Sequence, residues 1–174
     1  MRKFLIVVDM QNDFIDGFLG TPEAQAIIPA AAVTIRSFGG KIFATLDTHF
    51  ENYLQTAEGR KLPVEHCIKG TPGWEINAEI RAALGQRDVE YIEKNTFGSV
   101  DLPRLIEKAA GGEEFEAEFI GLCTDICVVS NVLLVKAHFP EMKITVDSAC
   151  CAGVTPAKHE SALETMRSCQ IDII

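Results

Sequence analysis

The stretch KFLIVVD, residues 3–9, is an apolar run that ends in a carboxylate. Similar runs recur along the chain: KIFATLD (41–47), VEYIEK (89–94), EFIGLC (118–123), KITVDS (143–148) and CQIDII (169–174). Several of them are apolar on both faces, which is typical of strands buried in the middle of a parallel sheet. We therefore expect six strands, beginning with residues 3–9.

Segments with helical periodicity separate these runs: 23–38, about 74–84, 101–110, 126–138 and 156–168. Asp101 is placed to cap one of them, and Pro103 lies in its first turn. Because strand and helix alternate, right-handed crossovers predict a three-layer α/β/α fold with a six-stranded, mainly parallel sheet. We expect one domain over residues 1–174. Residues 48–72 have neither period, and a loop of that length is either functional or disordered.

Composition limits the classes of function. With 174 residues, of which 47% are hydrophobic, the chain can fill one core. A formal net charge of -9 and a pI near 4.9 leave no basic face for nucleic acid or anionic lipid, so we expect neither partner. The first apolar run is too short for a signal peptide, which favours a cytoplasmic protein. No phosphate-binding motif follows it, so we expect no nucleotide cofactor.

Three reactive groups are expected at one edge of the sheet. The carboxyl ends of parallel strands meet there, and Asp9 and Lys94 end two of the runs. Cys127 lies in the first turn of the predicted helix, where the helix start and a nearby ammonium would lower its pKa. Asp9 could accept the thiol proton and return it to a leaving group. Each residue also has an ordinary alternative, as a core cysteine, a capping aspartate or a solvated lysine.

The remaining cysteines and two histidines have structural interpretations. The chain has six cysteines without regular spacing, so we expect free thiols rather than disulfides. Four of them lie in apolar strand contexts and are interpreted as core residues: Cys123, Cys150, Cys151 and Cys169. His138 and His159 are interpreted as surface or helix-end residues.

A second group of reactive side chains lies at the start of the long loop and within it. Asp47 and His49 alternate along an extended segment, so both can point toward one cation, and His66 follows in the same loop. Two imidazoles and a carboxylate suit Zn, Fe or Mn and leave positions open for water or substrate. The sequence therefore predicts a site for one divalent metal ion.

Together these motifs resemble the isochorismatase-like cysteine hydrolase superfamily and, within it, the nicotinamidase branch. The resembling pieces cover nearly the whole chain: VVDMQNDF (7–14), DTH (47–49), HCIKGTPGWEI (66–76), EKNTFGS (93–99) and GLCTDICV (121–128). The resemblance implies a catalytic triad of Asp9, Lys94 and Cys127. It also implies a cis peptide bond between Leu122 and Cys123, and an oxyanion hole formed by the backbone N–H groups of Cys123 and Cys127.

The resemblance extends to the metal site, because nicotinamidases carry a ligand set that isochorismatases proper lack. The implied ligands are Asp47, His49, Glu58 and His66. The family often has an aromatic residue that stacks on the pyridine ring, whereas this chain reads LPVEHC with Leu62 there, and it is one residue longer between Glu58 and His66. Phe14 and Phe97 are expected to supply apolar walls beside Leu62.

The implied function is a metal-containing cysteine amidohydrolase that converts nicotinamide, or a related small carboxamide, to its acid and ammonia through a thioester. Water activated by Asp9 or on the metal would hydrolyse the thioester, and the metal would also hold the pyridine nitrogen. The expected partners are a small-molecule amide substrate and further copies of the chain in a dimer or tetramer. Two alternatives stay open: a related hydrolase of carbamoyl or ureido compounds, and a non-catalytic metal-binding or thiol redox protein.

Overall fold

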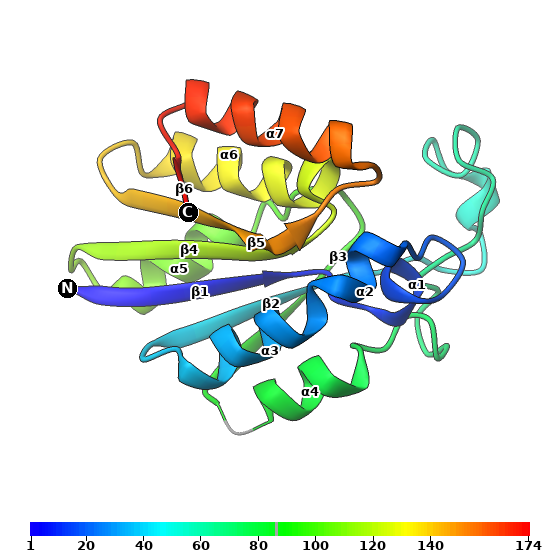
Figure 1. The fold of residues 1–174 in the computed structure, drawn as a ribbon, viewed down its shortest axis with the longest axis horizontal. Helices are drawn as coiled ribbons and strands as arrows, with labels where there is room; N and C mark the ends of the chain where they lie inside the picture. The colour runs from blue at the N-terminus through cyan, green and yellow to red at the C-terminus, as the bar shows by residue number, and fades with distance from the viewer. Residues whose placement is uncertain (86) are drawn as a thin grey trace.

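The computed structural model describes residues 1–85 and 87–174. Its centre is a six-stranded sheet in the order β3-β2-β1-β4-β5-β6, and every pairing between neighbours is parallel. The strands are β1 (Arg2–Val8), β2 (Lys41–Asp47), β3 (Val89–Lys94), β4 (Phe115–Leu122), β5 (Lys143–Ala152) and β6 (Asp172–Ile173). Helices cover both sides of this sheet, which confirms the expected three-layer α/β/α fold (Figure 1).

Two helical layers bury the two faces of the sheet. The helices are α1 (Asn12–Ile15), α2 (Pro22–Ala26), α3 (Ile28–Ser37), α4 (Ala78–Leu84), α5 (Leu102–Ala110), α6 (Val129–His138) and α7 (Pro156–Ser168). Leu5 and Val7 of β1 belong to the core under α3 and α4, whereas Phe4 and Ile6 belong to the core under α5, α6 and α7. Burial on both faces explains why the run KFLIVVD has no polar position between Lys3 and Asp9. Within the described residues, no helix is long and apolar enough to cross a membrane.

The helices differ from the expected ones at their ends. The segment 23–38 forms two helices, because Pro29 in the first turn of α3 has no N–H to continue the preceding helix. The helix expected from residue 74 begins only at Ala78, where the side chain of Asn77 accepts bonds from the backbone N–H groups of Glu79 and Ile80. The expected helix 126–138 opens with a π-helical turn, Thr124–Val128, before α6.

The last strand is shorter than predicted. Cys169 and Gln170 complete the turn after α7, and Gln170 has a left-handed backbone with a φ of 64°. Asp172 and Ile173 then form the strand that pairs with β5, and Ile174 adds backbone hydrogen bonds to Val146 and Ser148. Cys169 is exposed, so the expectation that it lies in the core is wrong. β5 in turn extends beyond residue 148 to Ala152, with an irregular register opposite Phe119–Gly121.

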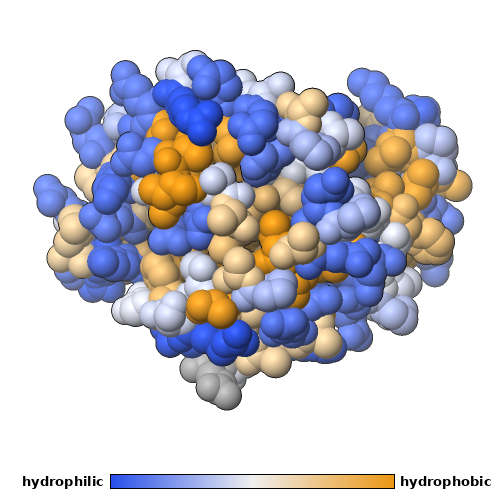
Figure 2. Space-filling model, in the orientation of Figure 1, coloured by the Kyte–Doolittle hydropathy of each residue, from blue (hydrophilic) through white to orange (hydrophobic). Residues whose placement is uncertain are grey.

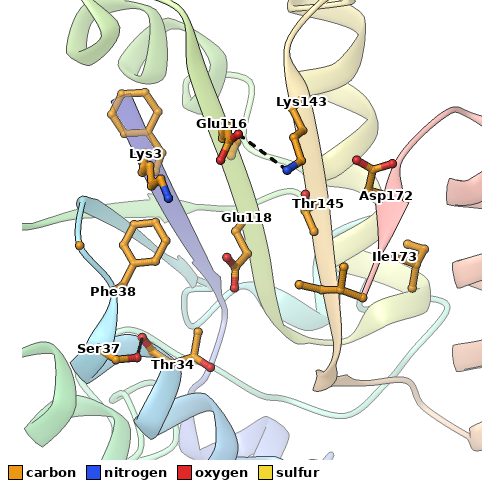
Figure 3. A pocket seen from close by; sticks show the side chains of 14 residues that line it. Lys3, Thr34, Ser37, Phe38, Glu116, Glu118, Lys143, Thr145, Asp172 and Ile173 are labelled. Atoms are coloured by element: carbon orange, nitrogen blue, oxygen red, sulfur yellow. Dashed lines mark hydrogen bonds and ion pairs between the residues drawn. The ribbon is translucent and has the colours of Figure 1, made fainter. Parts of the chain in front are cut away.

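A cavity of about 720 Å³ lies near the amino ends of the strands, between the end of α3 and strands β1, β4, β5 and β6 (Figure 3). Its charged side chains come largely from the sheet, and Lys143 forms an ion pair with Glu116 at 3.7 Å. Burial and the charge of Asp147 raise the pKa of Glu118. The carboxyl ends of the strands, where reactive groups were expected, lie at the opposite end of the sheet.

The long segment after β2 has a defined structure and is held against residues 11–13. The backbone N–H of Cys67 donates to Asp13 Oδ2 at 2.8 Å. The side chains of Asn12 and Gln11 donate to the carbonyls of Pro72 and Trp74, each at 2.8 Å. Its only regular element is a short 3₁₀ turn, Tyr53–Gln55, among the described residues. These bonds keep the loop over the carboxyl ends of the strands (Figure 1).

Gly73 lies against this anchor, and the structure leaves no room for a side chain there. A Cβ added to Gly73 would lie 2.1 Å from Asp13 Oδ2, the atom that accepts the Cys67 bond. We expect Gly73→Ala to lower the free energy of unfolding by about 2 kcal/mol in urea denaturation. A Cβ at Gly39 would meet nothing within 4 Å, so Gly39→Ala is the control and should change stability by less than about 0.5 kcal/mol. Equal effects of the two substitutions would contradict this role of Gly73.

Candidate active site

Asp9, Lys94 and Cys127 come together at the carboxyl edge of the sheet. Asp9 follows β1, Lys94 ends β3, and Cys127 lies in the π-helical turn between β4 and α6. The Nζ atom of Lys94 is 2.6 Å from Asp9 Oδ2 and 3.6 Å from Cys127 Sγ. All three residues are buried, Asp9 completely. The three side chains that the sequence singled out therefore form one buried cluster.

The two oxygens of the Asp9 carboxylate have different partners. Thr45 donates its hydroxyl to Asp9 Oδ1 at 2.7 Å. Oδ2 has the Lys94 ammonium as its ion-pair partner, 2.6 Å away. Asp9 also lies within hydrogen-bonding reach of the Cys127 thiol, so the carboxylate is placed to exchange a proton with it.

The electrostatics of the cluster differ from the sequence prediction. Burial and the charge of Asp9 raise the pKa of Cys127 well above its ordinary value, and Lys94 opposes this only in part. The expectation of a lowered thiol pKa is therefore wrong, because desolvation outweighs the ammonium. Burial also raises the pKa of Asp9, against the effect of Lys94. The cluster thus pairs a protonated thiol with a carboxylate whose proton affinity is raised.

The backbone leading to Cys127 runs very close to β1. The Leu122–Cys123 peptide bond is cis, as the resemblance implied. Gly121 has a φ of 121°, and a Cβ at this position would lie 2.1 Å from the carbonyl oxygen of Val8, so only glycine fits. Burial raises the pKa of the Cys123 thiol to about 12. Cys123 and Cys127 both face the same cavity.

The four expected metal ligands also converge. Asp47 Oδ2 is 3.0 Å from His49 Nε2 and 3.5 Å from His66 Nε2. Glu58 Oε1 lies 3.8 Å and 3.7 Å from the same two nitrogens. Donor atoms of Asp47, His49 and His66 all lie within 4.8 Å of one another. Burial opposes ionisation of Asp47, but hydrogen bonds with His49 and His66 outweigh it and lower its pKa.

The surroundings of these ligands fix their direction. The Nδ1 atom of His66 bonds to the carbonyl of Val64 at 2.8 Å, which leaves the Nε2 lone pair directed at the cluster. Gln11 bonds to both backbone groups of Asp47, each at 2.8 Å. Two carboxylates and two imidazole nitrogens held in this way fit a borderline divalent ion such as Zn, Fe or Mn. The residues present therefore match the group that the sequence predicted.

Tyr53 connects the metal ligands to the wall of the cavity. Its buried ring meets the His49 and His66 rings edge-on, with centroid distances of 4.7 Å and 5.0 Å. Its hydroxyl donates to the carbonyl of Leu62 at 2.9 Å. Burial and the charges of Glu58 and Asp47 raise its pKa to about 12. Tyr53 therefore packs the two imidazoles and holds the segment that carries Leu62.

Both clusters open into one cavity of about 820 Å³. The three residues expected to contact substrate, Phe14, Leu62 and Phe97, all line it. Phe14 is buried with its ring 5.5 Å from that of His66. Leu62 and Phe97 are 38% and 47% exposed, so they lie toward the opening. Hydrophobic side chains also reach the surface on the part of the molecule formed by the loop after β2, at the right of Figure 2.

Several residues that organise the site were not singled out from the sequence. Thr45 and Gln11 act through partners 36 residues away, and Tyr53 acts through partners in the folded loop, so neither periodicity nor spacing marks them. His159 lies at the start of α7, as the helix-end interpretation allowed, and it is half-buried, with Nδ1 2.8 Å from Thr124 Oγ1 in the turn that carries Cys127. All six cysteines are free, as expected.

Comparison with known proteins gives consistent results. A family model described as the isochorismatase domain matches residues 3–174. An isochorismatase family protein of Bacillus subtilis, PncA, is 31% identical over 94% of this chain and 93% of its own length. A pyrazinamidase/nicotinamidase of Streptococcus mutans has 26% identity and a TM-score of 0.84 over 99% of both chains. The pyrazinamidase of Pyrococcus horikoshii, solved in complex with zinc, has 28% identity and a TM-score of 0.77 over 100% of this chain and 99% of its own.

The contacts of Tyr53 give a test that does not depend on turnover. Tyr53→Leu removes the ring that packs both imidazoles, so we expect it to weaken zinc binding by about 10- to 100-fold. Tyr53→Phe keeps the ring and loses only the bond to Leu62, so its effect should be clearly smaller. Competition with a chromophoric chelator measures both affinities. Tyr91→Leu is the control, because Tyr91 is exposed on β3, and a loss there equal to that of Tyr53→Leu would refute the packing role.

Proposed function

The chain belongs to the isochorismatase family, and from that premise we propose that it is a metal-containing cysteine amidohydrolase that hydrolyses nicotinamide, or a closely related small carboxamide, to the acid and ammonia. The observation that carries this proposal is the contact among Cys127, Lys94 and Asp9 at the base of a cavity that also holds the Asp47, His49 and His66 cluster. Amide hydrolysis needs a nucleophile, a base that becomes an acid, and a fixed substrate, and this arrangement can supply all three.

In the first half-reaction, Asp9 accepts the thiol proton as Cys127 Sγ attacks the carbonyl carbon of the amide. Lys94 stabilises the charge that moves between sulfur and carboxylate, since its Nζ contacts both groups. The backbone N–H groups of Cys123 and Cys127 are proposed to bind the oxyanion. Asp9 then gives its proton to the departing nitrogen, the carbon–nitrogen bond breaks, and ammonia leaves behind a thioester on Cys127.

In the second half-reaction, Asp9 takes a proton from a water molecule that attacks the thioester carbon. The carbon–sulfur bond breaks, the acid is released, and the proton returns from Asp9 to Cys127. A raised pKa of Asp9 suits this exchange, because a base that also acts as an acid must hold its proton near working pH. No nucleotide cofactor takes part in this scheme.

A divalent ion held by Asp47, His49, Glu58 and His66 would supply a Lewis-acid contact for the ring nitrogen of a pyridine carboxamide. Phe14, Leu62 and Phe97 are proposed to enclose the ring. The proposal treats residues 1–174 as one hydrolase domain. It also includes a cytoplasmic role in NAD salvage and assembly as a dimer or tetramer, both carried over from the family resemblance.

A second candidate is a related hydrolase of another small amide, carbamoyl or ureido compound. Leu62 favours it, because an aliphatic side chain at the opening of the cavity offers less stacking to a pyridine ring than an aromatic one would. The chemistry at Cys127 would be the same, and only the groups that contact the rest of the substrate would differ. Turnover of a panel of amides that includes nicotinamide separates the two candidates.

The nucleophile is tested by ammonia release from nicotinamide. Cys127→Ala should lower kcat at least about a thousandfold, because no other group can form the thioester. Cys123→Ala removes a thiol in the same turn but keeps the backbone N–H, so its loss should be far smaller. Undiminished turnover in the Cys127→Ala protein would refute the proposed mechanism, and equal losses in both variants would remove the distinction between the two thiols.

The metal site is tested by metal content rather than by rate. We expect the purified protein to bind one divalent ion per chain, and His49→Ala to weaken that binding by at least about a hundredfold. His138 is the matched control, because it is an exposed histidine on α6, outside the cluster. Elemental analysis with chelator titration measures both variants. A His49→Ala protein that retains the ion as tightly as His138→Ala would contradict the assignment.

A further inference from the structure

We propose that the cavity binds carboxamides that carry a carboxylate on an aliphatic spacer, and that Lys61 and Lys158 at its opening hold this second group. The inference rests on the proposed hydrolase function and goes further in naming the substrate class. It arises from the charges around the opening, which the scheme for nicotinamide leaves unused.

Lys61 and Lys158 come from distant parts of the chain but line the same cavity as Cys127. Lys61 lies in the loop after β2, where its backbone N–H donates to the carbonyl of Glu58, and Lys158 lies in the first turn of α7. Both are exposed, whereas Cys127 is buried at the base of the cavity. The two ammonium groups therefore belong to the opening, at a distance from the reacting bond.

Neither ammonium is neutralised by a neighbour. Lys41, Lys69 and Lys143 each form an ion pair with a glutamate. Among the described residues, Lys61 and Lys158 form none, although the chain has 25 acidic residues against 16 Lys and Arg. Two unpaired lysines that line one cavity give a local positive field on a protein whose net charge is -9.

The remaining charges of the cavity do not cancel that field at the opening. Its two carboxylates, Asp47 and Glu58, face the imidazoles of His49 and His66. Val154 just before α7 also lines the cavity, but its backbone N–H already donates to Asp125 Oδ1 at 2.9 Å, so the attraction for an anion at the opening comes from the two ammonium groups. An anionic group is therefore favoured where Lys61 and Lys158 line the same opening.

The cavity also has the room and the walls for a longer molecule. A volume of about 820 Å³ falls in the range of pockets that hold drug-sized ligands, so it also has room for a chain longer than a single-ring amide. Leu62, Phe97 and Val154 line it and are 38%, 47% and 38% exposed. These side chains can contact a methylene chain that runs from the base to the opening. A substrate with an amide at one end, a methylene chain and a carboxylate at the other end matches Cys127 at the base, the apolar walls and the lysines at the opening.

The test compares the monoamides of glutaric, adipic and pimelic acids with the corresponding diamides, in which a neutral carboxamide replaces the carboxylate. We expect the metal-loaded wild-type protein to have a kcat/KM at least about tenfold higher on the best monoamide than on its diamide, mostly through KM. The Lys61→Gln/Lys158→Gln double variant should lose most of that ratio. Lys108→Gln is the control, because Lys108 is an exposed lysine on α5, away from the cavity.

Binding gives a second measurement that needs no turnover. The Cys127→Ala protein is titrated with glutarate, adipate and pimelate by calorimetry, and we expect the affinity to fall with added salt. Adding Lys61→Gln and Lys158→Gln to the Cys127→Ala protein should lower the affinity about tenfold. Equal kcat/KM for acid and diamide in the wild-type protein would overturn the inference. A preference for the monoamide that persists in the Lys61→Gln/Lys158→Gln variant would also overturn it, because the metal ion and not the lysines would then bind the carboxylate. If no amide at all is hydrolysed, the proposed function fails, while dicarboxylate binding still decides the role of the lysines.

Discussion

The buried ammonium of Lys94 holds the two halves of the site together. Its Nζ atom is 2.6 Å from an oxygen of Asp9 and 3.6 Å from an oxygen of Asp47, so one cation lies between the carboxylate of the thiol cluster and a ligand of the metal cluster. The attraction of these groups and of Cys127 raises the pKa of Lys94, even though burial acts in the opposite direction. Removing one partner of a buried ion pair usually costs about 3–5 kcal/mol. Lys94 is therefore the one cation that contacts both carboxylates.

The strand order makes that contact possible. β2 separates β3 from β1, and Lys94 pairs in register with Asp47, so its long side chain must extend past β2 to reach Asp9. Thr45 of β2 holds the other oxygen of Asp9, and Gln11 after β1 holds the backbone of Asp47. The two clusters are thus positioned from neighbouring strands of a rigid sheet. The loop after β2, which is anchored by the bond between Cys67 and Asp13, adds His66 to the metal cluster.

Much of this arrangement could be predicted from the sequence, because it follows from where strands end. Asp9, Asp47 and Lys94 each come at or just after the carboxyl end of an apolar run, and parallel strands bring such positions to one edge. The contacts of Gln11 and Tyr53 could not be predicted, since their partners are brought near only by the folded loop. The prediction of a lowered pKa for Cys127 was wrong because the sequence indicates which charged residues lie near the thiol but not how deeply the thiol is buried. The break between α2 and α3 was predictable in principle from Pro29.

The central claim is that Cys127, and not its neighbour Cys123, forms a thioester with the substrate while Asp9 carries the proton. Acid quenching of the metal-loaded protein during turnover, followed by intact mass spectrometry and peptide mapping, tests it most directly. With nicotinamide, or with whichever amide turns over best, the account predicts one added acyl group per chain, attached at Cys127 and removed by thiol exchange. Steady turnover with no acyl group trapped, or an acyl group located at Cys123, would contradict it.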